Sequence, residues 1–138
     1  MTMSSIDNVR LGLIWQRLSG MADEVAESFI RSSFSSVVRE NSDMAFSLLD
    51  PQGRQFIQTR RSIPSFIGTL PRTLRAILVE FPLKSLNEGD VLISNDAWLG
   101  TGHLNDISMV HPIFYKGRIV AFAGSTAHTA DIGGAPSP

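Results

Sequence analysis

Two short polar segments each combine a histidine with an acidic residue and could together bind a metal ion. The first is Gly102-His103-Leu104-Asn105-Asp106, and the second is Ala127-His128-Thr129-Ala130-Asp131. Imidazole nitrogen and carboxylate oxygen are ligands of zinc, manganese and ferrous iron. Two histidines and one carboxylate leave coordination positions open for water or substrate, as in a catalytic metal site. His103, Asp106 and His128 are therefore the candidate metal ligands.

A β-hairpin predicted between the two segments would bring them together. Residues 107–114 are expected to form a strand, residues 115–118 a turn, and residues 119–124 the return strand. The open ends of an antiparallel hairpin lie side by side, so the three candidate ligands should be neighbours in space. The pattern His-x-x-Asp also occurs by chance. The alternative is that both histidines are loop residues hydrogen-bonded to nearby acids.

Three further aspartates could serve the same site. Asp43 precedes an apolar strand, and a buried carboxylate there would need a partner: a cation, Arg39, backbone N–H groups or simple exposure to water. Asp96 follows the strand at 91–93 and is either a hydrogen-bond partner of the metal ligands or a turn residue. Asp131 is a fourth ligand, an acid that orients a ligand, or a helix cap. Asp96 and Asp131 are the candidates for a base.

The rest of the chain predicts an α/β fold of the mixed α+β kind. Apolar residues at three- and four-residue steps from Leu11 to Phe29 indicate an amphipathic helix, capped near Ser4 and Asp7 and open to a break at Gly20. A second short helix or a turn is expected at 31–40. Residues 43–50 and 54–58 predict a hairpin, and a packed helix is expected at 71–81 before Pro82.

Composition excludes several classes of protein. The chain has 138 residues, a formal net charge of −1 and no cysteine, so a basic nucleic-acid surface, disulfides and thiolate metal sites are not expected. The sequence contains neither a long apolar run nor a secretory leader, which fits a cytoplasmic protein away from membranes. No phosphate-binding glycine loop occurs, so nucleotide chemistry would belong to another chain or domain. The ending from Gly133 to Pro138 reads as a cut end.

Several separate segments resemble the signature of one enzyme family. These are residues 89–106, with Asn95-Asp96-Ala97-Trp98 and His103-Leu104-Asn105-Asp106, and residues 127–134, with Ala127-His128-Thr129-Ala130-Asp131. Shorter segments resemble the same signature in order and spacing, at residues 39–43, 49–54, 63–64 and 68–71. Over roughly residues 8–138 the chain resembles the hydantoinase B, 5-oxoprolinase and acetone carboxylase α-subunit family.

That resemblance implies the N-terminal part, residues 1–138, of a longer metal-binding subunit in a hetero-oligomer. A hydantoinase A-like subunit or domain would bind ATP and phosphorylate a cyclic amide substrate, and metal-activated water would then complete the hydrolysis. By position, His103, Asp106 and His128 match the family's ligands for a divalent metal, and Asp43 matches a further ligand. The isolated piece is expected to be inactive.

Two other functions remain open on the sequence alone. The first is the α-type subunit of an ATP-dependent ketone carboxylase, which also needs an oxygen-preferring metal beside an activated substrate. The second is a non-catalytic structural or interaction fragment, for which exposed strand edges and apolar patches would favour association. Many relatives have histidine where this chain has Ser62 and Phe66, and proline where it has Ala97 and Asn105. The first two differences leave the substrate open.

Overall fold

The fold is a five-stranded antiparallel sheet with helices on both faces, seen in a computed structural model that describes residues 7–66, 68–131 and 133. The helices are α1 (Asn8–Ser32), α2 (Ser36–Asn41) and α3 (Thr69–Glu80), with short 3₁₀ turns η1 (Pro64–Phe66) and η2 (Leu83–Ser85). The strands are β1 (Met44–Leu49), β2 (Gln55–Gln58), β3 (Leu92–Ser94), β4 (Asp106–Tyr115) and β5 (Arg118–His128). The predicted α+β class is confirmed.

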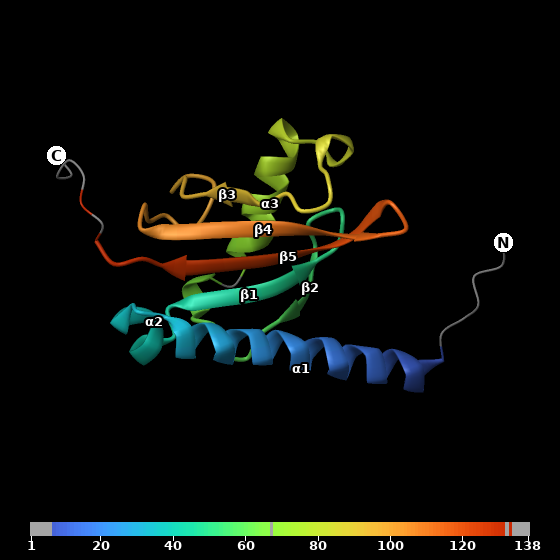
Figure 1. The fold of residues 1–138 in the computed structure, drawn as a ribbon, viewed down its shortest axis with the longest axis horizontal. Coiled ribbons are helices and arrows are strands. Elements are labelled where there is room, and N and C mark those ends of the chain that lie inside the picture. The colour runs from blue at the N-terminus through green and yellow to red at the C-terminus, as the bar shows by residue number, and fades with distance from the viewer. Residues whose placement is uncertain (1–6, 67, 132, 134–138) are drawn as a thin grey trace.

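The strand order is β2-β1-β5-β4-β3, so β5 lies at the centre (Figure 1). The two expected hairpins, β1–β2 and β4–β5, are both present. They join through β1 and β5, with Met44 opposite Ala127 and Leu49 opposite Phe122. This long-range pairing brings the start of β1 beside the end of β5.

The two faces of the sheet pack against different helices. On one face α3 contributes to the larger core, which contains Leu49, Leu70, Leu74, Leu86, Val110 and Phe122. On the other face α1 and α2 enclose a smaller core around Ala26, Val38 and Met44. There the rings of Phe29 and Phe46 meet edge to face with centroids 5.3 Å apart. Side chains alternate between faces along each strand, so the sequence of β4 and β5 serves both cores.

Helix α1 forms where the apolar stripe predicts it, but it has no break and only part of the stripe is buried. Asp7 caps it by accepting a hydrogen bond from the N–H of Arg10 at 2.7 Å, whereas Ser4 lies outside the described residues. The helix continues through Gly20 without a break. Its N-terminal half is exposed, including Leu11 at 52% and Trp15 at 51% of their accessible surface. The stripe therefore contributes to a core only in its second half.

Strand β5 is longer than predicted, and this corrects the expected surroundings of one histidine. The sequence predicts a return strand that ends at residue 124, with His128 in a loop, but β5 runs to His128. The reason is the central position of β5, because β1 and β4 hydrogen-bond to its two edges up to this end. The prediction for α3 holds with a small shift, since the helix begins at Thr69, before Pro71.

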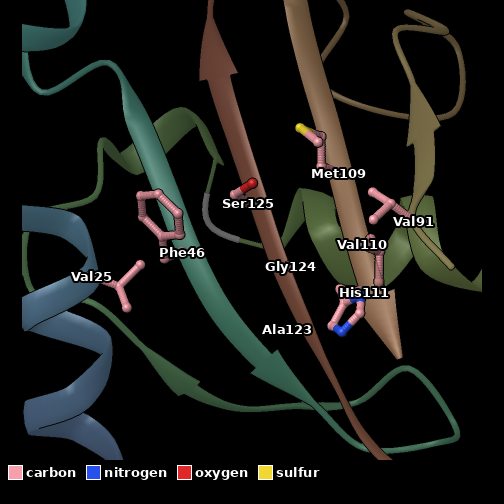
Figure 2. A pocket seen from close by; sticks show the side chains of 9 residues that line it. All are labelled: Val25, Phe46, Val91, Met109, Val110, His111, Ala123, Gly124 and Ser125. Atoms are coloured by element: carbon pink, nitrogen blue, oxygen red, sulfur yellow. The ribbon is translucent and has the colours of Figure 1, made fainter. Parts of the chain in front are cut away.

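Part of the α1-facing side of the sheet is not covered by a helix. A hollow of about 270 Å³ lies between α1 and the sheet, lined by Val25, Phe46, Val91, Met109 and His111 among others (Figure 2).

Within the described residues, no helix is apolar over a length that would cross a lipid bilayer.

Candidate metal site

Three predicted ligands meet at the end of the β4–β5 hairpin. His103, Asp106 and His128 each offer a ligand atom, and these atoms all lie within 4.8 Å of one another. Asp106 begins β4 and stands opposite His128, which ends β5. His103 lies in the loop just before β4. The hairpin therefore brings together Asp106 and His128, which are 22 positions apart in sequence, as the predicted proximity of its two open ends requires. A register shift between Ile113 and Phe114 places them directly opposite each other.

Asp106 and His128 form the inner part of this cluster. The N–H at Nδ1 of His128 donates to Oδ1 of Asp106 at 2.8 Å. The Asp106 side chain is only 5% exposed and that of His128 is 25% exposed. This bond orients the imidazole and leaves its Nε2 available as a ligand atom, an arrangement in which a carboxylate commonly supports a metal-binding histidine.

His103 approaches from a loop on the solvent side. Gly102 has φ of +92°, a conformation that glycine adopts without strain, and the N–H of Asp106 donates to the carbonyl of His103 at 3.2 Å. The resulting turn holds the His103 ring with its centroid 5.1 Å from that of His128. Because His103 is exposed, the cluster is open to water on this side.

Asp43 lies next to the cluster, at the start of the strand on the other side of β5. The N–H of His128 donates to the carbonyl of Asp43 at 3.0 Å, so residues 43, 128 and 106 form one row across β1, β5 and β4. Burial raises the pKa of the Asp43 carboxyl and the Asp106 charge adds to this, while His128 and His103 act in the opposite direction. Asp43 is therefore coupled to the cluster, although it is not one of the three residues within 4.8 Å.

A buried pair of hydroxyls lies on the same face, one row farther into the sheet. Ser108 and Thr126 stand opposite each other on β4 and β5, and their hydroxyl oxygens are 2.9 Å apart. Both side chains are buried, at 2% and 0% exposure. They separate Asp106 and His128 from the apolar core at Val110. Sequence reasoning missed this pair, although the two-residue spacing from Asp106 and from His128 indicates a shared face.

The carboxylates of Asp96 and Asp131 make hydrogen bonds within their own loops. Asp96 accepts from the N–H groups of Trp98 and Leu99 at 2.8 and 3.3 Å, and Asp131 accepts from the N–H of Gly133 at 2.9 Å. Both residues are exposed. These bonds are the turn-forming role that aspartate often has.

The loop that carries His103 is tied to two other segments. Asn95 donates from Nδ2 to the carbonyl of Leu104 at 3.3 Å. On the other side, the N–H and the hydroxyl of Thr129 both donate to the carbonyl of Asn105, each at 2.8 Å. The sequence offered no specific signal for the Thr129 contact, because it depends on the final register of β5.

His111 lies on the opposite face of the sheet from the candidate ligands. Its ring lines the hollow beside α1 (Figure 2), and its Nδ1 is 2.8 Å from the carbonyl oxygen of Asp90. The histidine is exposed and in mid-strand, as a surface or structural histidine would be.

Comparison with known proteins identifies the family. Residues 7–137 match the family model described as hydantoinase B/oxoprolinase. The chain is 31% identical over 133 residues to a protein from Pseudomonas sp. (strain NS671) that is named as the putative B component of a D-/L-hydantoinase. That match covers 95% of this chain and 22% of the relative.

Two solved structures share the fold. The ATP-dependent caprolactamase from Pseudomonas jessenii matches with a TM-score of 0.82 and 28% identity, over 98% of this chain and 23% of that one. A nucleotide-free acetone carboxylase matches with a TM-score of 0.76 and 21% identity, over 85% of this chain and 16% of that one, which is a likeness of fold. The chain thus spans less than a quarter of each of these three proteins. With a family match over nearly its whole length, the chain belongs to the hydantoinase B/oxoprolinase family.

Proposed function

We propose that this chain forms the metal-binding region of an ATP-dependent enzyme that opens cyclic amides, of the hydantoinase, oxoprolinase or lactamase type. The observation that carries the proposal is the convergence of His103, Asp106 and His128 within 4.8 Å, at the end of the hairpin. Family membership supports the enzyme class, and the 28% identity to a caprolactamase supports the cyclic amide as substrate class.

The donor set fits a divalent transition metal. Two imidazoles and one carboxylate match the ligands of zinc, manganese and ferrous iron, and three protein ligands leave coordination positions open. A metal held by these residues would supply activated water for hydrolysis. His128 is aligned by Asp106, His103 faces solvent, and Asp43 lies beside the cluster as a candidate for a further ligand.

The remaining two aspartates have supporting roles in this proposal. Asp131 lies shortly after His128, and Asp96 follows β3; either is a candidate base or orienting group. Their present hydrogen bonds to backbone N–H groups favour the orienting role, because one oxygen of each carboxylate is already held by its own loop.

The ATP-dependent step belongs to another subunit or domain in this proposal. The sequence has no phosphate-binding glycine loop, whereas the caprolactamase is described as ATP-dependent and the hydantoinase relative is named as one component of its enzyme. A hydantoinase A-like subunit in the cytoplasm would bind ATP and phosphorylate the substrate. The site described above would then hydrolyse the activated amide in a hetero-oligomeric complex.

Metal content of purified protein tests the core of the proposal. We expect about one metal per chain by elemental analysis, with loss of that metal in His103→Ala and in His128→Ala. His111→Ala is the matched control, since it removes an imidazole from the other face of the sheet, and it should retain the metal. Equal metal content in all four proteins would contradict the proposal.

A second experiment distinguishes a hydrolase from a carboxylase and uses the complex with the ATP-binding partner. ATP turnover with cyclic amides indicates the hydrolase, and ATP turnover with ketones and bicarbonate indicates the carboxylase.

A further inference from the structure

Thr129, the residue directly after His128, makes a double contact with the loop that carries His103. Its backbone N–H donates to the carbonyl oxygen of Asn105 at 2.8 Å, and its hydroxyl donates to the same oxygen at 2.8 Å. In return, Nδ2 of Asn105 lies 3.5 Å from the carbonyl oxygen of Thr129. The contact continues the β4–β5 pairing one residue beyond the end of both strands.

Arg72 of α3 holds the earlier part of this loop by donating to the carbonyl of Trp98 at 2.6 Å. Around residues 102–105, the other hydrogen bonds are longer than the two from Thr129. They are the N–H of Gly102 to Ala97 at 3.1 Å, the N–H of Asp106 to His103 at 3.2 Å, the N–H of Asn105 to Nδ1 of His103 at 3.3 Å, and Asn95 to Leu104 at 3.3 Å. The loop also has little apolar anchorage, because the neighbouring Leu104 is 67% exposed. Among the hydrogen bonds of residues 102–105, the two from Thr129 are therefore the shortest, and they tie this part of the loop to the end of β5.

Asn105 is close to His103 in sequence and adjacent to Asp106, while Thr129 is adjacent to His128. A contact that holds residue 105 against residue 129 also holds the backbones that carry the two imidazoles, whose ring centroids lie 5.1 Å apart. A site that is held in place before binding loses less conformational entropy when its ligand arrives. The backbone N–H alone would continue the strand pairing in any non-proline residue, so the side-chain hydroxyl is the specific addition at this position.

We propose that Thr129 is a positioning residue, whose hydroxyl holds the His103 loop against the end of β5 and sets the His103–His128 geometry for a divalent metal. The metal part of this inference rests on the function proposed above. The positioning part is a property of the metal-free chain and is measurable without any ion.

The test compares Thr129→Val, which removes the hydroxyl but keeps the branched shape, with Thr129→Ser, which keeps the hydroxyl. Ser85→Ala is the matched control, since the Ser85 hydroxyl also donates to a backbone carbonyl at 2.8 Å, in η2. Zinc is titrated into each metal-free 138-residue chain by calorimetry. We expect Thr129→Val to bind about tenfold more weakly, equivalent to about 1.4 kcal/mol. The zinc affinity of Thr129→Ser should stay within about twofold of the wild-type affinity, and the zinc affinity of Ser85→Ala should be unchanged.

A second measurement does not depend on the metal. In the metal-free chain, nuclear Overhauser contacts between the His103 and His128 ring protons should be present in the wild type and in Thr129→Ser, and lost in Thr129→Val. If Thr129→Val retains both these contacts and wild-type zinc affinity, the inference is wrong. If the wild type binds no zinc but loses the ring contacts in Thr129→Val, the proposed metal function fails and the positioning role stands. Should Thr129→Val unfold, Thr129→Ala decides the same question, because it also removes the hydroxyl and adds no metal ligand.

Discussion

At the residue scale, the buried contact between Asp106 and His128 determines how the candidate site can work. Asp106 is nearly inaccessible, and its Oδ1 is occupied by the N–H of His128. The carboxylate can therefore bind a metal through its second oxygen or act by orienting His128. In both cases its negative charge strengthens the imidazole as a ligand, so the charge rather than the shape of the side chain is the important property.

Replacing Asp106 with asparagine separates charge from shape. Because the amide oxygen still accepts the hydrogen bond from His128, we expect little change in the thermal midpoint of unfolding. Metal affinity should fall by about 10- to 100-fold, the usual consequence of losing a carboxylate that supports a histidine ligand. Zinc titration and thermal unfolding of the same preparation check both statements. Retained zinc affinity in Asp106→Asn would show that the carboxylate charge is not used.

At Asp43, in contrast, the negative charge is expected to lower the stability of the metal-free fold. Burial raises the pKa of this carboxyl in the folded chain above its ordinary value of 3.8. An acid whose folded pKa is raised destabilises the fold at pH values above that pKa, and the cost disappears as the pH falls below the unfolded value. We therefore expect metal-free Asp43→Asn to have a higher thermal midpoint than the wild type at about pH 7. The difference should shrink toward about pH 3, and a lower midpoint for the variant at neutral pH would contradict this prediction.

At the element scale, the turn between β1 and β2 is organised by one carboxylate. Asp50 accepts hydrogen bonds from the N–H groups of Gln52 and Arg54, both at 2.9 Å, and from Nε of Arg54 at 2.6 Å. Gly53 completes the turn with φ of +72°. Its carbonyl accepts a hydrogen bond from Arg75 of α3 at 3.1 Å. The local turn signal Asp50-Pro51-Gln52-Gly53 thus also ties the hairpin to the helix.

The Asp50 turn predicts a defined response to acid. Desolvation opposes the shift, but the hydrogen bonds from Arg54 and Gln52 outweigh it and lower the pKa of Asp50 below its ordinary value of 3.8. The stabilisation is therefore present above the unfolded pKa and is lost as the pH falls through the folded pKa. We expect Asp50→Ala to lower the thermal midpoint at about pH 7, with the difference from wild type vanishing near about pH 2. A constant difference across this range would exclude the carboxylate as its source.

Helix α3 and the sheet approach each other tightly at Gly124 of β5. A Cβ placed there would lie 3.2 Å from methyl carbons of Leu49 and Leu70, in the larger core. We expect Gly124→Val to lower the free energy of unfolding by about 1–3 kcal/mol, the usual cost of adding methyl groups to a packed core. Ala123→Val is the control, because Ala123 faces the hollow on the other side of the sheet. Urea denaturation of both variants decides the matter: equal stability of Gly124→Val and wild type would rule out tight packing at this point.

At the scale of the whole molecule, the two faces of the sheet are unequally covered. The α3 face has the larger core and the candidate metal site. On the other face, apolar side chains remain exposed beside the hollow, including Val25 at 51%, Ile93 at 62% and Met109 at 41%. Neighbouring exposed apolar residues of this kind favour association.

Self-association of the 138-residue chain should therefore depend on this apolar face. We expect the wild type to show concentration-dependent sedimentation, and the double variant Ile93→Lys with Met109→Glu to sediment as a monomer. Both positions are exposed, and a surface substitution usually changes the free energy of unfolding by no more than about 0.5 kcal/mol. The free energy of unfolding of the double variant should therefore lie within about 1 kcal/mol of the wild-type value. Phe34→Lys is the control, since Phe34 is fully exposed in the turn between α1 and α2. A wild type that stays monomeric at high concentration would contradict the prediction.

The sequence alone determined the features that depend on neighbouring residues. Periodicity predicted α1 and α3, and turn residues predicted the β1–β2 and β4–β5 hairpins. The second hairpin predicted that His103, Asp106 and His128 lie near one another, and they do. The pairing of Asp106 with His128 also depends on a register shift between Ile113 and Phe114, which the turn residues do not encode. The motifs in residues 89–106 and 127–134 were enough to indicate the family, and the family match covers residues 7–137.

Only the tertiary structure decided the features that depend on distant segments. The pairing of β1 with β5 supports β5 up to its end near His128 and brings Asp43 beside the cluster. The register shift in the β4–β5 pairing places Thr129 in reach of Asn105. Such pairing is chosen by burial on both faces of the sheet, a property of the whole fold that no local pattern encodes. The apolar stripe of α1 makes the same point, because its spacing predicts a helix but not which of its residues will find a core.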